Sequence, residues 1–228
     1  MLLNAKTAIS TSAVLLVPYS KWHVPRYHEW MKDEEIQEAT ASEPLSLEEE
    51  YGMQQSWRQD PDKLTFIVCQ GPGSSPLRDE DDSPERMVGD VNLFLRVEDG
   101  EEEGAAPQVV GEIELMIAEK RNQQRGFGKA TLLAFLRYIV EHEEEIVEEF
   151  VRGQGGNLEG VGGRLSCLSV KIGQGNERSL RLFAGALFRK VSEEANYFGE
   201  FELRRTELSR ESVVNGQDYV ELGYGRVV

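Results

Sequence analysis

The sequence has few cysteines, few basic residues and no long apolar run. Its two cysteines, Cys69 and Cys167, lie in apolar stretches, which favours reduced core thiols over a disulfide framework. The longest apolar run, Ala13–Val17, is far shorter than the ~18 residues that a membrane-spanning helix needs. The first ten residues lack a basic segment followed by an apolar core, so we expect a cytoplasmic protein, with the nucleus as the alternative.

Basic side chains are outnumbered, since 41 acidic residues against 25 lysines and arginines leave a net charge of −16. This charge argues against general binding to nucleic acids or anionic membranes, both of which need clustered cations. It suits a basic partner or an amine substrate, although an acidic solvated surface is the plainer explanation. The three histidines, His23, His28 and His142, are not at metal-ligand spacing, so we expect no metal site.

The 228 residues can bury one sizeable core, and strands alternate with helices along the chain. Apolar patterns predict strands over residues 14–19, 63–70, 87–97, 109–119 and 164–172, helices over 24–39, 45–60, 128–152 and 176–188, and a hairpin over 189–208. Ser46 and Glu49 have the spacing of a capping box. We expect one α+β domain over residues 1–228, with a core at about 12–205 and mobile loops at about 71–86, 98–108 and 153–163.

The stretch QQRGFGKA, residues 123–130, stands between a predicted strand and a predicted helix. Glycines there let ligand oxygens approach the free N–H groups of the helix start, where the helix dipole adds positive charge. Basic residues gather around it: Lys120, Arg121, Arg125 and Lys129. A Walker loop and a dinucleotide fingerprint both need glycines or a hydroxyl that this stretch lacks. An anion cradle and a plain strand-to-helix turn remain the two interpretations.

QQRGFG resembles the [QR]-x-x-G-x-[GA] pyrophosphate loop of the GNAT acetyltransferases, and NERSLRLF, residues 176–183, resembles that superfamily's second signature. The run VPRYHEWMKDEEIQEATASEPLSLEEEYGMQQSW, together with MVGDVNLFL, GEIELMIAE and KIGQGNERS, is similar to the eukaryotic N-acetyltransferase 9-like proteins. The resemblance covers roughly Val14–Val191. The glycine loop is moderately specific, whereas the longer run with KIGQGNERS is highly specific.

This resemblance implies the GNAT fold, a mixed central sheet with helices on both faces, splayed at two parallel strands. GEIELMIAE and RLSCLSVKI would be those strands, and acetyl-CoA the co-substrate, its pantetheine arm between them. Backbone around Ile117 and Ala118 would pair with the pantetheine amides. The remaining cofactor contacts implied by the resemblance are those of Gln123, Gln124, Arg125, Gly126, Phe127, Gly128 and Lys129 in the loop, and of Asn176, Ser179 and Phe183 across the cleft.

The chemistry requires a base, because an ammonium must lose a proton before its nitrogen can attack a thioester. Glu112 and Glu114 point to one face of their predicted strand, and either could accept that proton. The resemblance favours Glu112, although alternating glutamates on a half-exposed strand are common. The loop TASEP supplies Thr40, Ser42 and Glu43 as acceptor contacts, because the first two helices and their connection wall the acceptor site in this superfamily.

Phe183 departs from the family pattern, since many GNAT enzymes carry a tyrosine there to protonate the leaving thiolate. The resemblance therefore implies an acetyl-CoA-dependent N-acetyltransferase in which this acid is missing. We expect its acceptor to be an amine of a protein or peptide, an N-terminus or a lysine, although the acidic composition suits a polyamine equally well. A non-catalytic acyl-CoA-binding module that acts through protein contacts is the alternative. A scaffold in which the glycine loop is only a turn is the third interpretation.

Overall fold

The computed structural model describes residues 1–40, 42–99, 106–155, 162–213 and 218–226, so the expected loops at 98–108 and 153–163 fall partly outside it. Its strands are β1 (Thr7–Ser10), β2 (Val14–Pro18), β3 (Lys63–Gln70), β4 (Met87–Glu98), β5 (Gln108–Ile117), β6 (Leu165–Gly173), β7 (Arg189–Lys190), β8 (Glu200–Arg205) and β9 (Val220–Gly223). Its helices are α1 (Val24–Trp30), α2 (Glu34–Thr40), α3 (Leu47–Gln59), α4 (Phe127–Glu141), α5 (Glu143–Gly153), α6 (Glu177–Gly185) and α7 (Arg210–Val213), with short 3-10 turns at η1 (Leu3–Lys6) and η2 (Lys120–Asn122).

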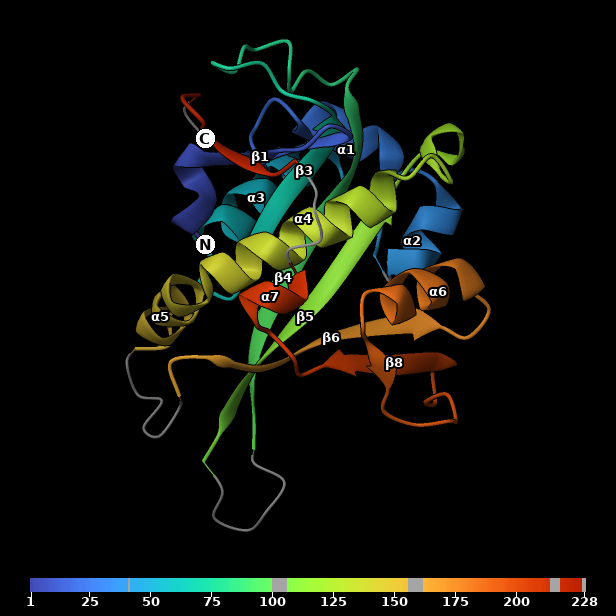
Figure 1. Cartoon of the computed structure of the whole chain (residues 1–228). Coiled ribbons are helices and arrows are strands. Elements are labelled where there is room, and N and C mark those ends of the chain that lie inside the picture. Colours follow the sequence, from blue (N-terminus) through green and yellow to red (C-terminus); the bar gives the residue numbers. More distant parts are fainter. Residues whose placement is uncertain (41, 100–105, 156–161, 214–217, 227–228) are drawn as a thin grey trace.

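All described strands form one sheet in the order β7-β8-β6-β5-β4-β3-β2-β1-β9 (Figure 1). β5 and β6 run parallel, and every other described pair is antiparallel. The parallel pairing extends only from Val109↔Leu165 to Glu112↔Ser169. Beyond Glu112, β5 continues along β4 while β6 continues along β8. The sheet is therefore splayed at its parallel pair, as the family resemblance implies.

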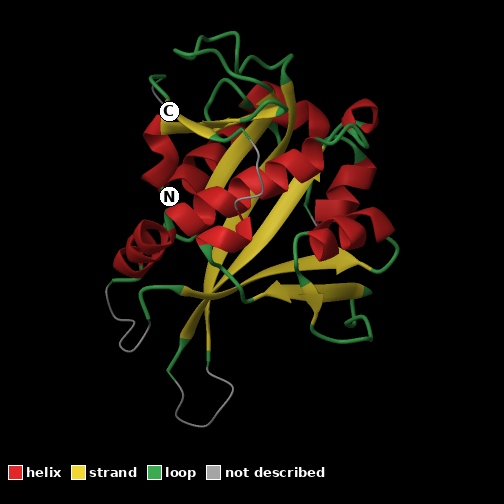
Figure 2. Ribbon diagram, in the orientation of Figure 1, coloured by secondary structure: helices red, strands yellow, loops and turns green. Residues whose placement is uncertain are grey.

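Helices cover both faces of the sheet, which confirms the expected α+β layering (Figure 2). Alternate residues of β5 face opposite layers. Ile113 joins the cluster that includes Phe135 of α4, whereas Met116 packs with Tyr27 and Trp30 of α1. Glu112 and Glu114 share the face of Met116. Both glutamates therefore lie on the side covered by α1 and α3.

Two helices predicted as continuous are each broken by a polar side chain. Residues 24–39 divide into α1 and α2 because the carboxylate of Asp33 accepts the N–H of Glu35 at 2.9 Å and so begins a new helix. Residues 128–152 divide at His142, whose φ of −118° is not helical and whose imidazole lies 2.9 Å from Glu221 of β9. The capping box of Ser46 and Glu49 is confirmed. The hairpin of β7 and β8 is also confirmed.

Strands β1 and β9 extend the sheet beyond the expected core. β1 lies between β2 and β9, which brings the two ends of the chain together (Figure 1). Only four residues make up each strand, and β9 is mostly exposed, so neither has a clear apolar alternation. A four-residue strand has only two residues on each face, too few for a clear sequence pattern.

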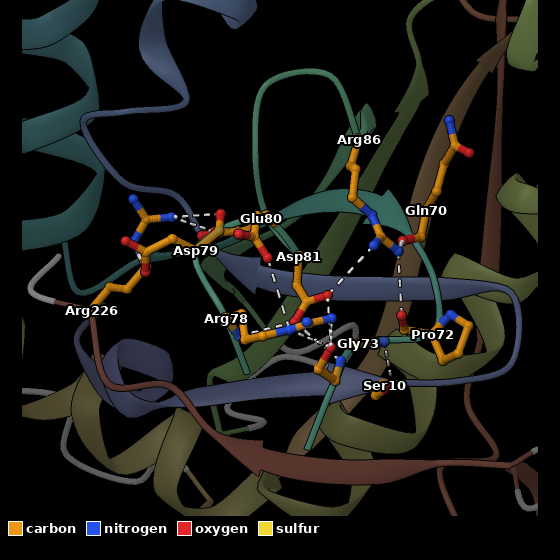
Figure 3. Close-up of polar contacts among 12 residues, drawn as sticks. Ser10, Gln70, Pro72, Gly73, Arg78, Asp79, Glu80, Asp81, Arg86 and Arg226 are labelled. Atoms are coloured by element: carbon orange, nitrogen blue, oxygen red, sulfur yellow. Dashed lines mark hydrogen bonds and ion pairs between the residues drawn. The ribbon is translucent and has the colours of Figure 1, made fainter. Parts of the chain in front are cut away.

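Polar side chains hold the turn-rich segment 71–86 in place (Figure 3). Asp81 accepts from the N–H groups of Ser74 at 3.1 Å and Arg78 at 2.9 Å. Arg226, just after β9, pairs with Asp79 at 3.4 Å. None of residues 71–86, all of which are described, belongs to a helix or strand. The mobility expected of this segment stays a prediction.

Gly89 permits the close approach of β4 and β5 beside the splay. A Cβ at this position would lie 1.8 Å from the carbonyl oxygen of Met116. We expect Gly89→Ala to lower the free energy of unfolding by ~3 kcal/mol, the upper end for overpacking, because backbone must move. Urea unfolding measures this change. Gly52→Ala is the control, since nothing lies within 4 Å of its Cβ on α3 and it should stabilise by roughly 0.5–1 kcal/mol. Equal urea unfolding midpoints for Gly89→Ala and Gly52→Ala would contradict the close approach of β4 and β5 at Gly89.

Candidate functional site

The glycine loop turns the chain from β5 into α4 through two residues with positive φ. Gln124 has a φ of 59° and Gly126, the N-cap of α4, a φ of 89°. Gly126 makes no side-chain cap, and the first helical hydrogen bond runs from Ala130 N–H to its carbonyl at 3.0 Å. The loop therefore leaves the helix start open.

A row of six N–H groups, those of residues 124–129, donates no hydrogen bond within the described part of the chain. Successive free amides at a helix start form an anion site, to which the helix dipole contributes. A Cβ at Gly126 would meet nothing within 4 Å, and one at Gly128 would meet side-chain atoms only at 3.7 Å and beyond. Neither glycine is therefore crowded by neighbouring atoms. Binding of a pyrophosphate by residues 124–129 stays a prediction.

Basic side chains flank this row. The guanidinium of Arg125 lies 5.3 Å from the centre of the Phe127 ring. Arg178 at the start of α6 donates to the amide oxygen of Gln124 at 3.1 Å when that amide is turned to face it. Lys129 lies in the first turn of α4. Arg178 thus joins the glycine loop to α6, and positive charge collects here in an otherwise acidic protein.

The end of β5 leads directly to this loop. The side-chain amide of Gln123 donates to the carbonyl of Ile117 at 3.1 Å, and the N–H of Ala118 donates to Val88 of β4 at 3.0 Å. Strand hydrogen bonds alternate between the two sides of a strand. The N–H of Ile117 consequently points to the side from which β6 has parted, where an added strand-like ligand could accept from it.

Glu112 is held by two cations. Its Oε2 accepts from Arg96 of β4 at 2.8 Å and lies 3.1 Å from Lys171 of β6, and its side chain is 15 % exposed. Arg96 also pairs with Glu98 at 2.8 Å. The carboxylate of Glu112 is therefore engaged in an ion-pair network that crosses β4, β5 and β6.

Glu114 has a different environment, two residues along the same face. Its side chain is exposed, and no hydrogen bond or ion pair within the described residues uses its carboxylate. Desolvation by the surrounding protein, with smaller contributions from the charges of Asp90 and Glu112, raises the pKa of Glu114 to about 7. A carboxylate with this pKa can exchange protons at neutral pH.

A buried polar cluster beside Glu114 was missed by the sequence analysis. Asp90 of β4 is 3 % exposed, accepts from Asn92 at 2.8 Å, and lies 3.5 Å from the hydroxyl of Tyr27. Desolvation raises the pKa of Asp90 to about 6, against the opposing hydrogen bonds from Asn92 and Tyr27. The signal was present, because GDVN interrupts an apolar strand with two polar residues two apart.

Two residues of the second signature, NERSLRLF at 176–183, make contacts that stabilise the fold. Asn176 caps α6 by accepting the N–H of Ser179 at 3.1 Å. Phe183 is 3 % exposed and packs edge-on against Phe188 at 5.1 Å between ring centres. The structure places α6 after the diverging end of β6, where the resemblance puts the far wall of the cleft. Cofactor contacts of Asn176, Ser179 and Phe183 stay predictions.

The expected acceptor residues lie at the end of α2 and just after it. Thr40 donates its hydroxyl to the carbonyl of Ile36 at 2.8 Å and lies 2.9 Å from the hydroxyl of Ser42. Glu43 is exposed, and residue 41 is outside the described range. An ion pair of 2.7 Å between Glu35 of α2 and Lys120 joins this part of the chain to the turn before the glycine loop. Acceptor contacts of Thr40, Ser42 and Glu43 stay predictions.

A cavity of about 190 Å³ lies elsewhere, lined by β2, the segment 71–86 and the residues after β9. β2 is three places from β5 in the sheet order. The acids there are engaged, since Asp82 accepts from Trp22 at 3.0 Å and Tyr224 at 2.6 Å. We place the functional site at the splay rather than in this cavity.

Two other kinds of site have no candidate among the described residues. No group of three or more histidines, cysteines and carboxylates there is arranged to hold a metal ion. Nor does any helix in the described ranges have the length and apolarity to cross a membrane.

Known proteins resemble this chain in sequence over most of its length. Residues 13–188 match the family model described as an acetyltransferase (GNAT) domain. An N-acetyltransferase 9-like protein of Schizosaccharomyces pombe is 39 % identical over 233 residues, covering 90 % of this chain and 100 % of that protein. The human alpha/beta-tubulin-N-acetyltransferase 9 is 43 % identical over 210 residues, covering 90 % and 86 %.

Solved structures resemble the fold. An aminoglycoside acetyltransferase in complex with coenzyme A superimposes with a TM-score of 0.59 at 14 % identity, covering 89 % of this chain and 100 % of that one. At this identity the likeness concerns the fold alone. The family model and the two sequence relatives carry the assignment further: the chain belongs to the GNAT acetyltransferase family, with the N-acetyltransferase 9-like proteins.

Proposed function

We propose that this acetyltransferase transfers the acetyl group of acetyl-CoA to a primary amine of another protein, an N-terminus or a lysine side chain. The observation that carries the proposal is the row of six free N–H groups at residues 124–129, beside the point where β5 and β6 part. A diphosphate bound there would place the attached thioester arm along β5. The free N–H groups and the edge of β5 that β6 leaves follow one another along the chain, which supports this mode of binding.

The residues of the loop fit the co-substrate. The N–H groups of residues 124–129, with the guanidinium of Arg125, would hold the diphosphate, and acetyl-CoA would supply the activated acetyl thioester. The N–H of Ile117 would stabilise negative charge on the acetyl oxygen in the transition state. No covalent enzyme intermediate is required, because the amine can attack the thioester directly.

Glu114 is the base that the environment favours over Glu112. Glu112 already neutralises Arg96 and Lys171, whereas Glu114 has no cation bonded to it in the described chain. Glu114 would take the proton from the acceptor ammonium, and the free amine would form the new C–N bond as the C–S bond breaks. With Phe183 in place of an acid, the CoA thiolate would leave without proton transfer from that position.

A protein acceptor is supported by the names of the relatives. The human, fly and mouse relatives are named alpha/beta-tubulin-N-acetyltransferase 9 at 43, 41 and 41 % identity. Tubulin subunits and peptides from their N-termini are therefore the first acceptors to test. The exposed helix α2 and the residues after it would contact such an acceptor, and a cytoplasmic location follows from the same proposal.

Activity should depend on the ionisation of Glu114. A base must be deprotonated to act, and the raised pKa of Glu114 lies at about 7. The value of kcat/KM for the acceptor should therefore fall as the pH drops below about 7 and level off above it, apart from ionisation of the amine itself. A pH profile of thiol release measures this. A profile that keeps full activity well below pH 6 would contradict the role of Glu114.

The proposal is tested by thiol release from acetyl-CoA with tubulin subunits and an N-terminal peptide library, with mass spectrometry to locate the acetyl group. Transfer to an α-amine or a lysine supports it. The core position of Phe183 favours one alternative, a non-catalytic acyl-CoA-binding module. Tight CoA binding without transfer to any amine would support that module.

A further inference from the structure

Three carboxylates lie on the α1 side of β4 and β5, each in a different state. Glu112 is paired with two cations, Glu114 is open to solvent, and Asp90 is buried. In the strand register Glu114 stands opposite Asn92, and Asp90 stands opposite Met116. Asp90 is thus the diagonal neighbour of Glu114 on the adjacent strand, roughly 7–8 Å away between the backbones and within reach of side chains.

Asp90 is fixed in place and incompletely bonded. Its Oδ2 accepts from Asn92 at 2.8 Å and faces the hydroxyl of Tyr27 at 3.5 Å. Its Oδ1 makes no hydrogen bond within the described residues, and neither does the Oδ1 of Asn92. An uncompensated carboxylate at a buried position exerts a strong field on its neighbours, because little water screens it.

The negative charge of Glu112 would also repel a negative charge on Glu114, but two cations neutralise Glu112. Arg96 reaches it from β4 at 2.8 Å and Lys171 from β6 at 3.1 Å. The charge of Glu112 is therefore offset by cations, whereas no cation within the described residues bonds to Asp90. The difference between the two neighbouring carboxylates comes from Asp90 and Arg96, which take no direct part in the proposed acetyl transfer.

We propose that Asp90 and Arg96 are positioning residues that set the proton affinity of Glu114 from opposite directions: Asp90 strengthens the hold of Glu114 on its proton, and Arg96 weakens it by neutralising Glu112. This inference rests on the proposed role of Glu114 as the base. The consequence is a carboxylate that accepts a proton near neutral pH although it is exposed.

The groups facing Glu114 are consistent with this arrangement. The protein around the carboxylate of Glu114 partly desolvates it, although the residue keeps contact with solvent, and this desolvation contributes most to its raised pKa. The charges of Asp90 and Glu112 add to the rise, and Lys171 opposes it. From α1 the phenol of Tyr27 faces both Asp90 and Glu114 and remains neutral, since burial raises its pKa well above the usual range. Tyr19 packs against Tyr27 at 5.2 Å between ring centres, and the charge of Glu50 raises the pKa of both phenols.

The test uses two variants with opposite expected effects on the full-length protein. Asp90→Asn keeps the shape and removes the charge, so the acid limb of the kcat/KM profile should move down by roughly one pH unit. Arg96→Gln leaves Glu112 less neutralised, so the same limb should move up. KM for acetyl-CoA should change little in either variant, because neither side chain belongs to the pyrophosphate loop. Circular dichroism and thermal melting verify that each variant is folded.

A readout without turnover completes the test. Carbon NMR of the side-chain carboxyl groups follows the titration of Glu114 in the free protein, with its resonance assigned by its loss in Glu114→Gln. We expect the midpoint to fall in Asp90→Asn and to rise in Arg96→Gln. If Asp90→Asn does not fold, the titration midpoint of Glu114 in Arg96→Gln alone tests the proposal. A rise supports it, and a fall contradicts it. Midpoints and acid limbs that coincide with wild type overturn the proposal.

The variants distinguish two ways in which the proposal could be wrong: Glu114 is not the base, or Asp90 and Arg96 do not change its proton affinity. If Glu114→Gln abolishes transfer while the Asp90→Asn and Arg96→Gln profiles match wild type, Glu114 is the base and its two neighbours do not tune it. If Glu114→Gln keeps full activity, the proposed base is wrong, and the NMR titration still shows whether the two neighbours control its proton. A shift of the same sign in both variants contradicts the opposed roles.

Discussion

Replacing Glu114 by glutamine should lower kcat for acetyl transfer about 10²- to 10⁴-fold, the range that a positioned general base contributes. Glutamine has the same shape but cannot take a proton, and the exposure of this side chain means that folding should be unaffected. Steady-state thiol release measures kcat, and calorimetry should show unchanged affinity for CoA. The effect would thus concern chemistry rather than binding.

Glu112→Gln is the matched comparison, two residues away on the same face. It removes the partner of Arg96 and Lys171 and should lower kcat much less than Glu114→Gln does. The family resemblance alone favours Glu112, so the pair of variants decides between the two. A large loss in Glu112→Gln with nearly full activity in Glu114→Gln would reverse our assignment of the base.

Gly126→Glu should weaken CoA binding about 100-fold or more. The change adds a carboxylate in front of the free amides and puts a side chain on a backbone with a φ of 89°. Loss of two hydrogen bonds to charged oxygens, each worth about 1.5–3 kcal/mol, suffices for this factor. Isothermal titration calorimetry with CoA measures it directly.

Gly155→Glu is the control for backbone strain. Gly155 also has a positive φ, 78°, a Cβ added there would meet nothing within 4 Å, and it follows α5 rather than the cofactor loop. The same substitution there should cost similar stability and leave CoA affinity unchanged. Retained affinity in Gly126→Glu, or equal losses in both variants, would show that the diphosphate is held elsewhere.

Much of the fold could be predicted because its strands and helices have clear patterns. The apolar runs of β2, β3, β4, β5 and β6 and the capping box of α3 each depend on neighbouring residues alone. The splay between β5 and β6 was predicted only through the family resemblance. It depends on which strands pair beyond Glu112, and periodicity contains no information on pairing.

The elements that could not be predicted depend on contacts between residues far apart in the sequence. The break at His142 involves Glu221 of β9, and β9 itself is a strand only because β1 lies beside it. Likewise, the two glutamates of β5 are indistinguishable in sequence, since both alternate with apolar residues. Arg96 on one side and Asp90 on the other give them different environments, and both of these residues come from β4.

A crystal structure of the protein with bound CoA tests the central claim most directly. We predict that the diphosphate oxygens accept hydrogen bonds from N–H groups of residues 124–129, and that the pantetheine arm lies between β5 and β6 beyond Glu112. A diphosphate bound away from this loop, or β5 and β6 paired along their whole length, would contradict the account.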